Sequence, residues 1–406
     1  MYVSRLFSGL EEGIERGEWS PEGVPTVYKL IEGILQSQHE LFLTFTIKNI
    51  QKKWKGKRNL TIKIKDKKTS IIILPFVDRL PNLFLKYASY INELNHLRMI
   101  WKIYKKNKPD IVYFDRSNVY CAAFFAYFLS VKVVWRVMGV PNSMKKILTH
   151  NNFFSLITRL AYKAPFSMAL CTEDGSGGYY WMHQALSSKT QKIMMMNGVD
   201  FDGYKSIDIK KSIPQNSIKI LFVSRLVDDK GCLEFMSAFI KALDLSQKNL
   251  FAIIVGDGNL GKQMKKMALD FGIENKVLFV GSVSHKISKG FQHYCDIYAS
   301  LNQMCNITNA NIEAMSSGIC MMVPNSRPKE GIDVYLDKLM PKDSIYRYGS
   351  TNNIENITNA IIYLSNHTAE RKERSEKIQL IAKQNIPTWK KRISNEIKML
   401  ESLVEH

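Results

Sequence analysis

Cysteine is scarce in this sequence, and its arrangement excludes two kinds of site. The six cysteines, spread over 406 residues, are Cys121, Cys171, Cys232, Cys295, Cys305 and Cys320. No two of them form a C-x-x-C pair, and no cluster of histidine and cysteine has the spacing of a metal site. We therefore predict no metal site and reduced thiols, as in a cytoplasmic protein.

The sequence also lacks a long apolar run. Its most apolar stretch, residues 120–131, is too short to span a bilayer and ends at Lys132, so it predicts a buried helix. The N-terminal residues MYVSRLFSGLEEG have no continuous apolar core of the kind that signal peptides require. We expect neither a targeting segment nor a transmembrane span.

Acidic residues are few relative to basic ones. Lysine and arginine number 57 against 37 aspartate and glutamate, which gives a net charge of +20. Residues 48–68 contain ten lysines or arginines and a single acid, Asp66, and residues 102–108 form a second basic cluster. One interpretation is composition bias on a solvated face. The other is an anionic partner, and Trp54 and Trp101 near these clusters favour a membrane surface. No recognisable nucleic-acid-binding module is present, so we expect no specific nucleic-acid partner.

Short apolar runs alternate with helical patterns along most of the chain. The runs that predict buried parallel strands lie at 41–46, 71–75, 111–114, 133–138 and 167–171, and again at 218–223, 250–255, 277–280, 297–299 and 319–323. The helical patterns lie at 27–35, 88–104, 122–129, 229–242, 260–271 and 354–364, with a final amphipathic helix from Trp389. The polar segment 203–217 is typical of a linker. The sequence therefore predicts two doubly wound α/β domains.

Two cations follow the first predicted strand of the second half. Arg225 and Lys230 lie in SRLVDDKG, where we expect a helix to begin at once. Two cations together with the free N–H groups of a helix N-terminus suit a diphosphate. The alternative is a pair of surface cations near a helix start.

A glycine-rich turn follows the next strand. Gly256, Gly258 and Gly261 match G-x-G-x-x-G, the pattern of dinucleotide-binding sites. That pattern requires an acid at the end of the following strand to bind a ribose, and LFVGSVSH has none there. The glycines therefore indicate a tight turn and a close approach of the backbone to a ligand or a helix.

A polar loop and an acid follow a later strand. We place Glu313 in the first turn of a helix that reads IEAMSSG, where its carboxylate could accept hydrogen bonds from a ribose. The alternative is an acid that only complements the helix dipole. The loop 306–311 offers N–H groups to a phosphate or a sugar. We expect His285 and His293 to be surface residues.

In this order and spacing, SRLVDDKG, VGDGNLG, YCDIYASLNQ and IEAMSSGICMMVPNS resemble the donor-binding domain of the retaining glycosyltransferases of family four. The resemblance is strongest over residues 218–325, and NGVD at 197–200 matches the family's junction between domains. It implies an α/β fold of the GT-B type, with two Rossmann-like doubly wound domains facing across a cleft. The acceptor-side domain would span 1–198 and the donor-binding domain 199–386, and a helix at 387–406 would cross back to the first domain.

The resemblance also implies roles for single residues. Arg225 and Lys230 would bind the donor's diphosphate and stabilise it as the leaving group, with no metal and no cofactor besides the nucleotide-diphosphate sugar. Glu313 would hold the ribose. Asp115, at a strand end, is a candidate for positioning the acceptor, with a structural role as the alternative. The remaining donor-binding candidates are Gly23 in the glycine-rich turn of the first domain, and Gly256, Gly258, Ile307, Thr308 and Asn309 in the second.

The sequence departs from the family at one informative position. Cys305 stands eight residues before Glu313, where the family has a first glutamate that contacts sugar hydroxyls. We expect sugar transfer from a nucleotide sugar to a glycan or lipid-linked acceptor, in the assembly of a bacterial surface polysaccharide at the inner face of the membrane. The alternative is a non-catalytic GT-B protein that binds a glycan or a nucleotide, and Cys305 is the residue that favours it.

Overall fold

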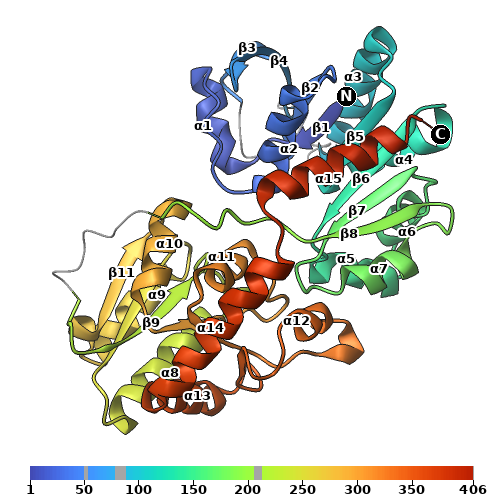
Figure 1. Ribbon diagram of the computed structural model, residues 1–406. Coiled ribbons are helices and arrows are strands. Elements are labelled where there is room, and N and C mark those ends of the chain that lie inside the picture. Colours follow the sequence, from blue (N-terminus) through green and yellow to red (C-terminus); the bar gives the residue numbers. More distant parts are fainter. Residues whose placement is uncertain (50–53, 78–87, 205–212, 406) are drawn as a thin grey trace. The chain divides into compact units, whose positions relative to one another are not determined.

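The computed structural model describes residues 1–49, 54–77, 88–204 and 213–405, which form two compact units (Figure 1). The first unit comprises Met1–Thr172, Gly178–Met195 and Lys390–His406. The second comprises Glu173–Gly177 and Met196–Trp389. No helix within the four described ranges is long and apolar enough to cross a membrane.

In the described part of the first unit, eight strands form one sheet in the order β3-β4-β2-β1-β5-β6-β7-β8. The strands are β1 (Tyr2–Arg5), β2 (Leu43–Thr46), β3 (Asn59–Ile64), β4 (Lys67–Leu74), β5 (Ile111–Asp115), β6 (Lys132–Met138), β7 (Met168–Thr172) and β8 (Gln191–Met195). The antiparallel edge strand β3 and its partner β4 are joined by Lys65 and Asp66, both with positive φ, as a tight hairpin turn requires.

The sequence predicted five of these eight strands and missed β1, β3 and β8. Each of the three carries exposed or polar residues: β1 ends at Arg5, β3 alternates asparagine, threonine and lysine with leucine and isoleucine, and β8 begins QKI. An apolar run is a signal only for strands that are buried on both faces. These three segments form strands because they pair with neighbouring strands, and the sequence does not reveal that pairing.

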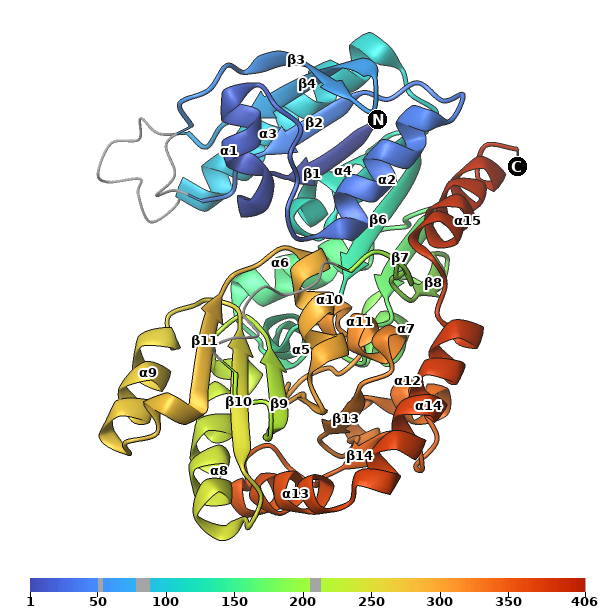
Figure 2. The same ribbon diagram turned by 60° about the vertical axis from the view of Figure 1, so that its left-hand side comes forward.

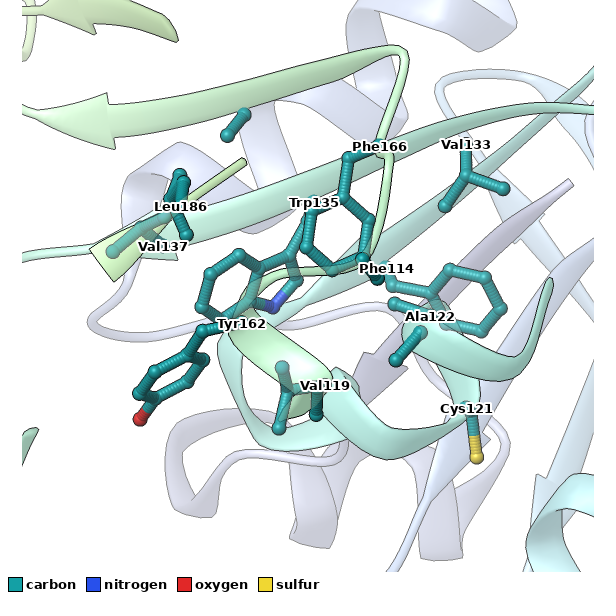
Figure 3. Packing of buried hydrophobic residues seen from close by; sticks show 14 of the residues in the cluster. Phe114, Val119, Cys121, Ala122, Val133, Trp135, Val137, Tyr162, Phe166 and Leu186 are labelled. Atoms are coloured by element: carbon teal, nitrogen blue, oxygen red, sulfur yellow. The ribbon is translucent and has the colours of Figure 1, made fainter. Parts of the chain in front are cut away.

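Four helices cover one face of the first sheet and share a core with it. They are α3 (Ala88–Asn107), α4 (Val119–Phe128), α6 (Phe153–Tyr162) and α7 (Gly178–Ala185), and α5 (Asn142–Thr149) precedes α6. Trp135 of β6 lies in this core (Figure 3). The centroid of its ring lies 5.6 Å from the ring centroid of Tyr162 and 5.4 Å from that of Phe166. The buried helix predicted at 120–131 is confirmed only for its first turns, because Tyr127 and Phe128 are exposed.

The helices α1 (Ser8–Arg16) and α2 (Pro25–Gln36) follow β1, and α2 packs against the last helix, α15 (Trp389–Ser402). Gly33 of α2 allows this approach, because a Cβ there would lie 2.4 Å from Ile393. The absence of a side chain at one position of α2 therefore helps to hold the end of the chain on the first unit.

Buried charges also join α15 to the first sheet. Glu396 bonds to Arg392, accepts a hydrogen bond of 2.5 Å from the Tyr113 hydroxyl, and lies 3.7 Å from Arg136. Burial acts to raise the pKa of Glu396, but the guanidinium groups of Arg392 and Arg136 outweigh it and hold that pKa below its usual value. All three charged side chains are buried, so removal of one partner leaves the others uncompensated.

In the described part of the second unit, six parallel strands form a sheet in the order β11-β10-β9-β12-β13-β14 (Figure 2). They are β9 (Ile218–Val223), β10 (Leu250–Val255), β11 (Val277–Gly281), β12 (Ile297–Ala299), β13 (Cys320–Val323) and β14 (Tyr346–Arg347). The five predicted strands of this half are confirmed, and β14 was too short to predict. The chain order reverses at β9, which pairs with β10 on one side and β12 on the other. Such a point is where open α/β sheets bind ligands.

Helices cover both faces of the second sheet. On one face lie α8 (Cys232–Leu245), α9 (Gly261–Asp270) and α13 (Ile354–Asn366). On the other lie α10 (His285–Tyr294), α11 (Asn309–Ser317), α12 (Val334–Leu339) and α14 (Thr368–Asn385). Covering both faces buries the strands completely, which is why their apolar runs were recognisable in the sequence.

Candidate active site

The carboxyl ends of β9, β10 and β11 and the N-terminus of α11 line a pocket of about 490 Å³ in the second unit. Six of the ten site residues predicted from the sequence line it: Arg225, Lys230, Gly256, Thr308, Asn309 and Glu313. These residues span 89 positions of the chain (225–313), and the parallel sheet brings them to one edge. The pocket is therefore the candidate active site.

Two cations enter the pocket from the segment after β9. Arg225 is exposed, and the Lys230 ammonium lies 3.3 Å from Asp229. The prediction that a helix begins beside Lys230 is confirmed with a start shifted by three residues: Asp228–Lys230 form a single 3₁₀ turn, and α8 begins at Cys232. Gly231 separates the two with φ +69°, a left-handed conformation that α-helices do not continue through. The cations therefore lie on a loop, and the N-terminus that faces the pocket belongs to another helix.

That N-terminus belongs to α11. Thr308 is its N-cap residue, with a hydroxyl that accepts a hydrogen bond from the Asn311 N–H, and Thr308, Asn309 and Ala310 line the pocket. The Asn309 side chain is held by the Asn197 amide, which donates to its oxygen at 2.7 Å. The first N–H groups of a helix have no partner within the helix and attract anions. Together with Arg225 and Lys230, which line the same pocket, they offer positive charge to an anionic ligand.

An acid and a histidine also line the pocket. We predicted Glu313 in the first turn of its helix, but it lies in the second turn of α11. The helix begins at Asn309, four residues before Glu313. Its carboxylate lies 2.7 Å from Nδ1 of His285, the first residue of α10. His285 is exposed, as predicted, but it also lines the pocket, which we did not predict. Its place in the pocket could have been inferred from its position just after a strand, a position that it shares with Arg225 and Gly256.

The glycines after β10 allow two loops to pack backbone to backbone. A Cβ at Gly256 would lie 1.8 Å from the Ser224 carbonyl oxygen, and one at Gly258 would lie 2.3 Å from that of Leu226. The loops are joined by hydrogen bonds from Ser224 N–H to Val255 (3.0 Å) and from Leu226 N–H to Asp257 (2.9 Å). The predicted close approach is thus to the neighbouring loop. Gly256 lines the pocket, whereas Gly258 does not.

We expect Gly256→Ala to lower the free energy of unfolding of the second unit by about 3 kcal/mol or more, because the new methyl group overlaps a backbone oxygen that packing holds in place. Gly272→Ala is the matched control: Gly272 has φ +62° but open space around the would-be Cβ. Its cost should be about 1 kcal/mol, the left-handed penalty alone. Urea titration measures both, and equal losses would contradict this explanation.

The segment 305–307 is held by groups of the second unit and is turned away from the pocket. Asp333 accepts hydrogen bonds from the Asn306 N–H (2.8 Å) and side chain (2.6 Å), and the Ile307 N–H donates to the Asp174 carbonyl at 2.9 Å. Ile307 is fully buried. The prediction that its amide faces the donor is therefore contradicted: the N–H is already bonded.

Cys305, the residue at the position of the missing glutamate, lies near charged groups of both signs: Asp174, Asp333 and Asp229 act to raise the pKa of its thiol, and Lys230 acts to lower it. Burial, with a contribution from Asp174, raises the pKa of the Cys305 thiol and keeps it protonated. Burial also raises the pKa of Asp333 to about 6 and that of Glu173 to about 7. Asp174 and Asp333 were not predicted from the sequence, because they lie in segments far from Cys305 in the chain.

The two remaining candidates lie in the first unit. The Asp115 carboxylate is buried and accepts hydrogen bonds from the Arg5 N–H (2.8 Å), the Ser4 hydroxyl (3.2 Å) and the Asn118 amide (2.7 Å). These bonds favour the structural alternative for Asp115. Gly23 is exposed, has φ +67°, and precedes α2.

Comparisons with known proteins agree with this architecture. Residues 204–336 match the family described as glycosyl transferases group 1. The chain is 27% identical over 219 residues to an uncharacterized glycosyltransferase of Methanocaldococcus jannaschii, a match that covers 52% of this chain. It covers 53% of that protein, so the chain spans about half the length of the curated relative that it matches.

Solved structures match over nearly the whole chain. Sucrose-phosphate synthase of Thermosynechococcus elongatus has a TM-score of 0.72 at 10% identity, and Anabaena HepE, solved with UDP and glucose, has 0.68 at 15%; each match covers 99% of both chains. The predicted α/β fold class is therefore confirmed: the chain has the GT-B fold. The family match and the fold together support a GT-B glycosyltransferase.

Proposed function

We propose that this protein is a retaining glycosyltransferase that moves a sugar from a nucleotide-diphosphate sugar to a glycan or lipid-linked glycan in surface-polysaccharide biosynthesis. The observation that carries the proposal is one pocket lined by Arg225, Lys230, the first residues of α11 and Glu313. A diphosphate would bind to the two cations and the N–H groups of α11, and the ribose would bind Glu313. The UDP bound to Anabaena HepE, which shares the fold, supports a nucleotide sugar as the donor.

In the proposed reaction, the bond between the anomeric carbon and the β-phosphate oxygen breaks as the acceptor hydroxyl oxygen bonds to the same carbon on the same face. The hydroxyl proton passes to an oxygen of the departing diphosphate. Negative charge develops on that diphosphate, and Arg225, Lys230 and the N–H groups of α11 stabilise it without reorganising. The chain then needs no separate catalytic base, and the proposal includes no metal and no cofactor.

Glu313→Ala should weaken nucleotide binding by about tenfold or more, because a carboxylate that would accept hydrogen bonds from the ribose hydroxyls is replaced by a methyl group. A thermal-shift series with UDP, GDP and their sugars measures the change and identifies the base as well. Glu355→Ala is the control, since Glu355 is an exposed acid in α13, far along the chain from the pocket residues. An unchanged midpoint shift in Glu313→Ala would contradict the ribose role.

A non-catalytic GT-B binding protein is the second candidate, and Cys305 at the position of the sugar-contacting glutamate favours it. The two candidates differ in one measurable product. Release of UDP or GDP from a nucleotide sugar, by transfer or by slow hydrolysis, would exclude the second. Nucleotide binding without any turnover, across a panel of donors, would exclude the first.

We also propose that the enzyme is cytoplasmic and peripheral to the inner face of the cell membrane, where lipid-linked acceptors are found. The net charge of +20 supports this location. Of the basic stretch 48–68, residues 50–53 lie outside the described residues. The rest includes the β3–β4 hairpin, with exposed Lys63, Lys65, Lys67 and Lys68.

A further inference from the structure

The first unit carries a group of exposed apolar side chains on three neighbouring helices. On α6, Phe153 is 76% exposed and Leu160 65%, and on α4, Phe128 is 71% exposed. Leu156 and Phe154 of α6, Tyr127 of α4, and Tyr90, Leu94 and Trp101 of α3 are exposed as well. Large apolar side chains that are exposed singly need no explanation, but a contiguous group indicates an interaction surface.

These side chains form one continuous surface, which we call the α3–α4–α6 surface. The rings of Tyr90 and Phe154 lie 6.2 Å apart, which joins α3 to α6. The Tyr127 hydroxyl donates to the Leu160 carbonyl at 3.1 Å, which joins α4 to α6. The residues therefore belong to a single patch within the first unit.

Helix α6 is turned so that its apolar stripe faces outward. Phe153, Leu156 and Leu160 recur at the spacing of one helix face, and all three are exposed. The side that packs on the unit includes Ser155 and Thr158, and Thr158 bonds to Tyr120 of α4 at 2.7 Å. Helix α6 is anchored in the core by Ala161 and Tyr162, and its exposed phenylalanine–leucine stripe gains no hydrophobic free energy in water. The stripe is available to a partner.

Charge identifies the kind of partner. No aspartate or glutamate occurs between Asp115 and Glu173, the segment that contains α4, α5 and α6, although seven lysines or arginines do, of which Arg136 alone is fully buried. On α3, Arg98 and Lys105 share the face of Leu94 and Trp101, and the Lys105 ammonium lies 3.9 Å from the Trp101 ring centre. The single acid of α3, Glu93, is neutralised by Lys48 at 2.6 Å. An apolar patch with cations and without acids complements an anionic lipid surface, where lysine and tryptophan lie between headgroups and acyl chains.

We propose that the α3–α4–α6 surface docks the enzyme on an anionic bilayer, with Phe128, Phe153 and Leu160 inserted among the lipids. The biological meaning of docking rests on the proposed function, because it would bring the enzyme to a lipid-linked acceptor. The docking surface differs from the one that the sequence favoured: the basic stretch 48–68 contributes attraction at a distance, and the α3–α4–α6 surface makes the contact.

The test is co-sedimentation of the full chain with vesicles of phosphatidylcholine alone and with vesicles that also contain phosphatidylglycerol. We expect binding to the anionic vesicles. Phe153→Asp/Leu160→Asp should lower the partition coefficient about tenfold or more, since two apolar contacts are lost and two negative charges gained. Leu269→Asp/Phe271→Asp in the second unit is the matched control, because those side chains are 64% and 62% exposed, and it should bind like the original chain.

A charge pair separates the two candidate surfaces. Arg98→Ser/Lys105→Ser should weaken binding to anionic vesicles about tenfold, and Lys57→Ser/Arg58→Ser on the basic stretch should weaken it only about twofold. Circular dichroism and the UDP thermal shift confirm folding of each variant, and Phe153→Ser replaces the aspartate pair if that pair does not fold.

Three results would overturn the proposal: no binding of the original chain to anionic vesicles, unchanged binding of Phe153→Asp/Leu160→Asp, or a monomer–dimer equilibrium that these substitutions abolish while vesicle binding persists. The last would mark the surface as an interface between two copies. Failure of the proposed glycosyltransferase function would appear separately, as absence of nucleotide binding and turnover in lipid-free solution.

Discussion

Replacing Arg225 or Lys230 with alanine should lower the kcat/KM of the proposed sugar transfer by about 100- to 1000-fold and leave the fold intact. The physical reason is that, in the proposed reaction, negative charge would develop on the departing diphosphate, and these two groups, which both line the pocket, would neutralise it. Removal of one cation leaves the transition state with less compensation, whereas the ground state, with its charge spread over both phosphates, loses less. The effect should therefore appear in kcat as well as in KM.

Two further variants separate the effect of the charge and its geometry from a general effect of mutation. Arg225→Lys retains the charge but loses the planar, two-pronged donor geometry, so its activity should fall between those of the original enzyme and Arg225→Ala. Lys241→Ala removes an exposed lysine from α8, outside the pocket, and should leave kcat/KM unchanged. Steady-state release of the nucleoside diphosphate provides the measurement. Near-original activity in both alanine variants would refute the role of this pocket in leaving-group stabilisation.

Replacing Glu396 with alanine lowers the free energy of unfolding of the first unit by about 3–5 kcal/mol. Glu396 is the carboxylate between two buried guanidinium groups, Arg136 and Arg392, and it also accepts a hydrogen bond from the Tyr113 hydroxyl. Without it, two positive charges remain in a site that water does not reach. Thermal or urea unfolding measures the loss. Glu401→Ala is the control: Glu401 lies on the same helix as Glu396, is partly exposed and pairs with His39, so its removal should cost about 1 kcal/mol or less.

The same residue predicts a pH dependence. Because the pKa of Glu396 in the folded protein lies below its usual value of 4.5, its charge stabilises the fold above that pH. The contribution disappears as the pH falls through the lowered, folded-state pKa. The difference in unfolding free energy between the original protein and Glu396→Ala should therefore be constant near neutral pH and shrink on acidification below about 4.5. A difference that grows on acidification would contradict the assignment.

Much of the second unit could be predicted from the sequence, and particular elements show why. Strands β9, β10 and β12 are confirmed with the predicted bounds, because they are buried on both faces and their apolar runs are unbroken. In the first unit, β3 and β8 carry polar residues and were missed. Helix α6 was also missed, although its residues are apolar. Its apolar stripe is exposed, so the expectation that apolar residues are buried predicts neither its length nor its orientation.

The sequence by itself determined the alternation of strands and helices in two halves, the cations after β9 and the acid of α11, because short-range patterns encode local structure and strand ends. Only the tertiary structure decided which of these groups meet. Thr308, Asn309 and His285 join Arg225 and Glu313 in one pocket, whereas Ile307, one position before Thr308, is turned into the core and bonded to Asp174. That choice depends on packing between segments far apart in the chain, and no local pattern contains it.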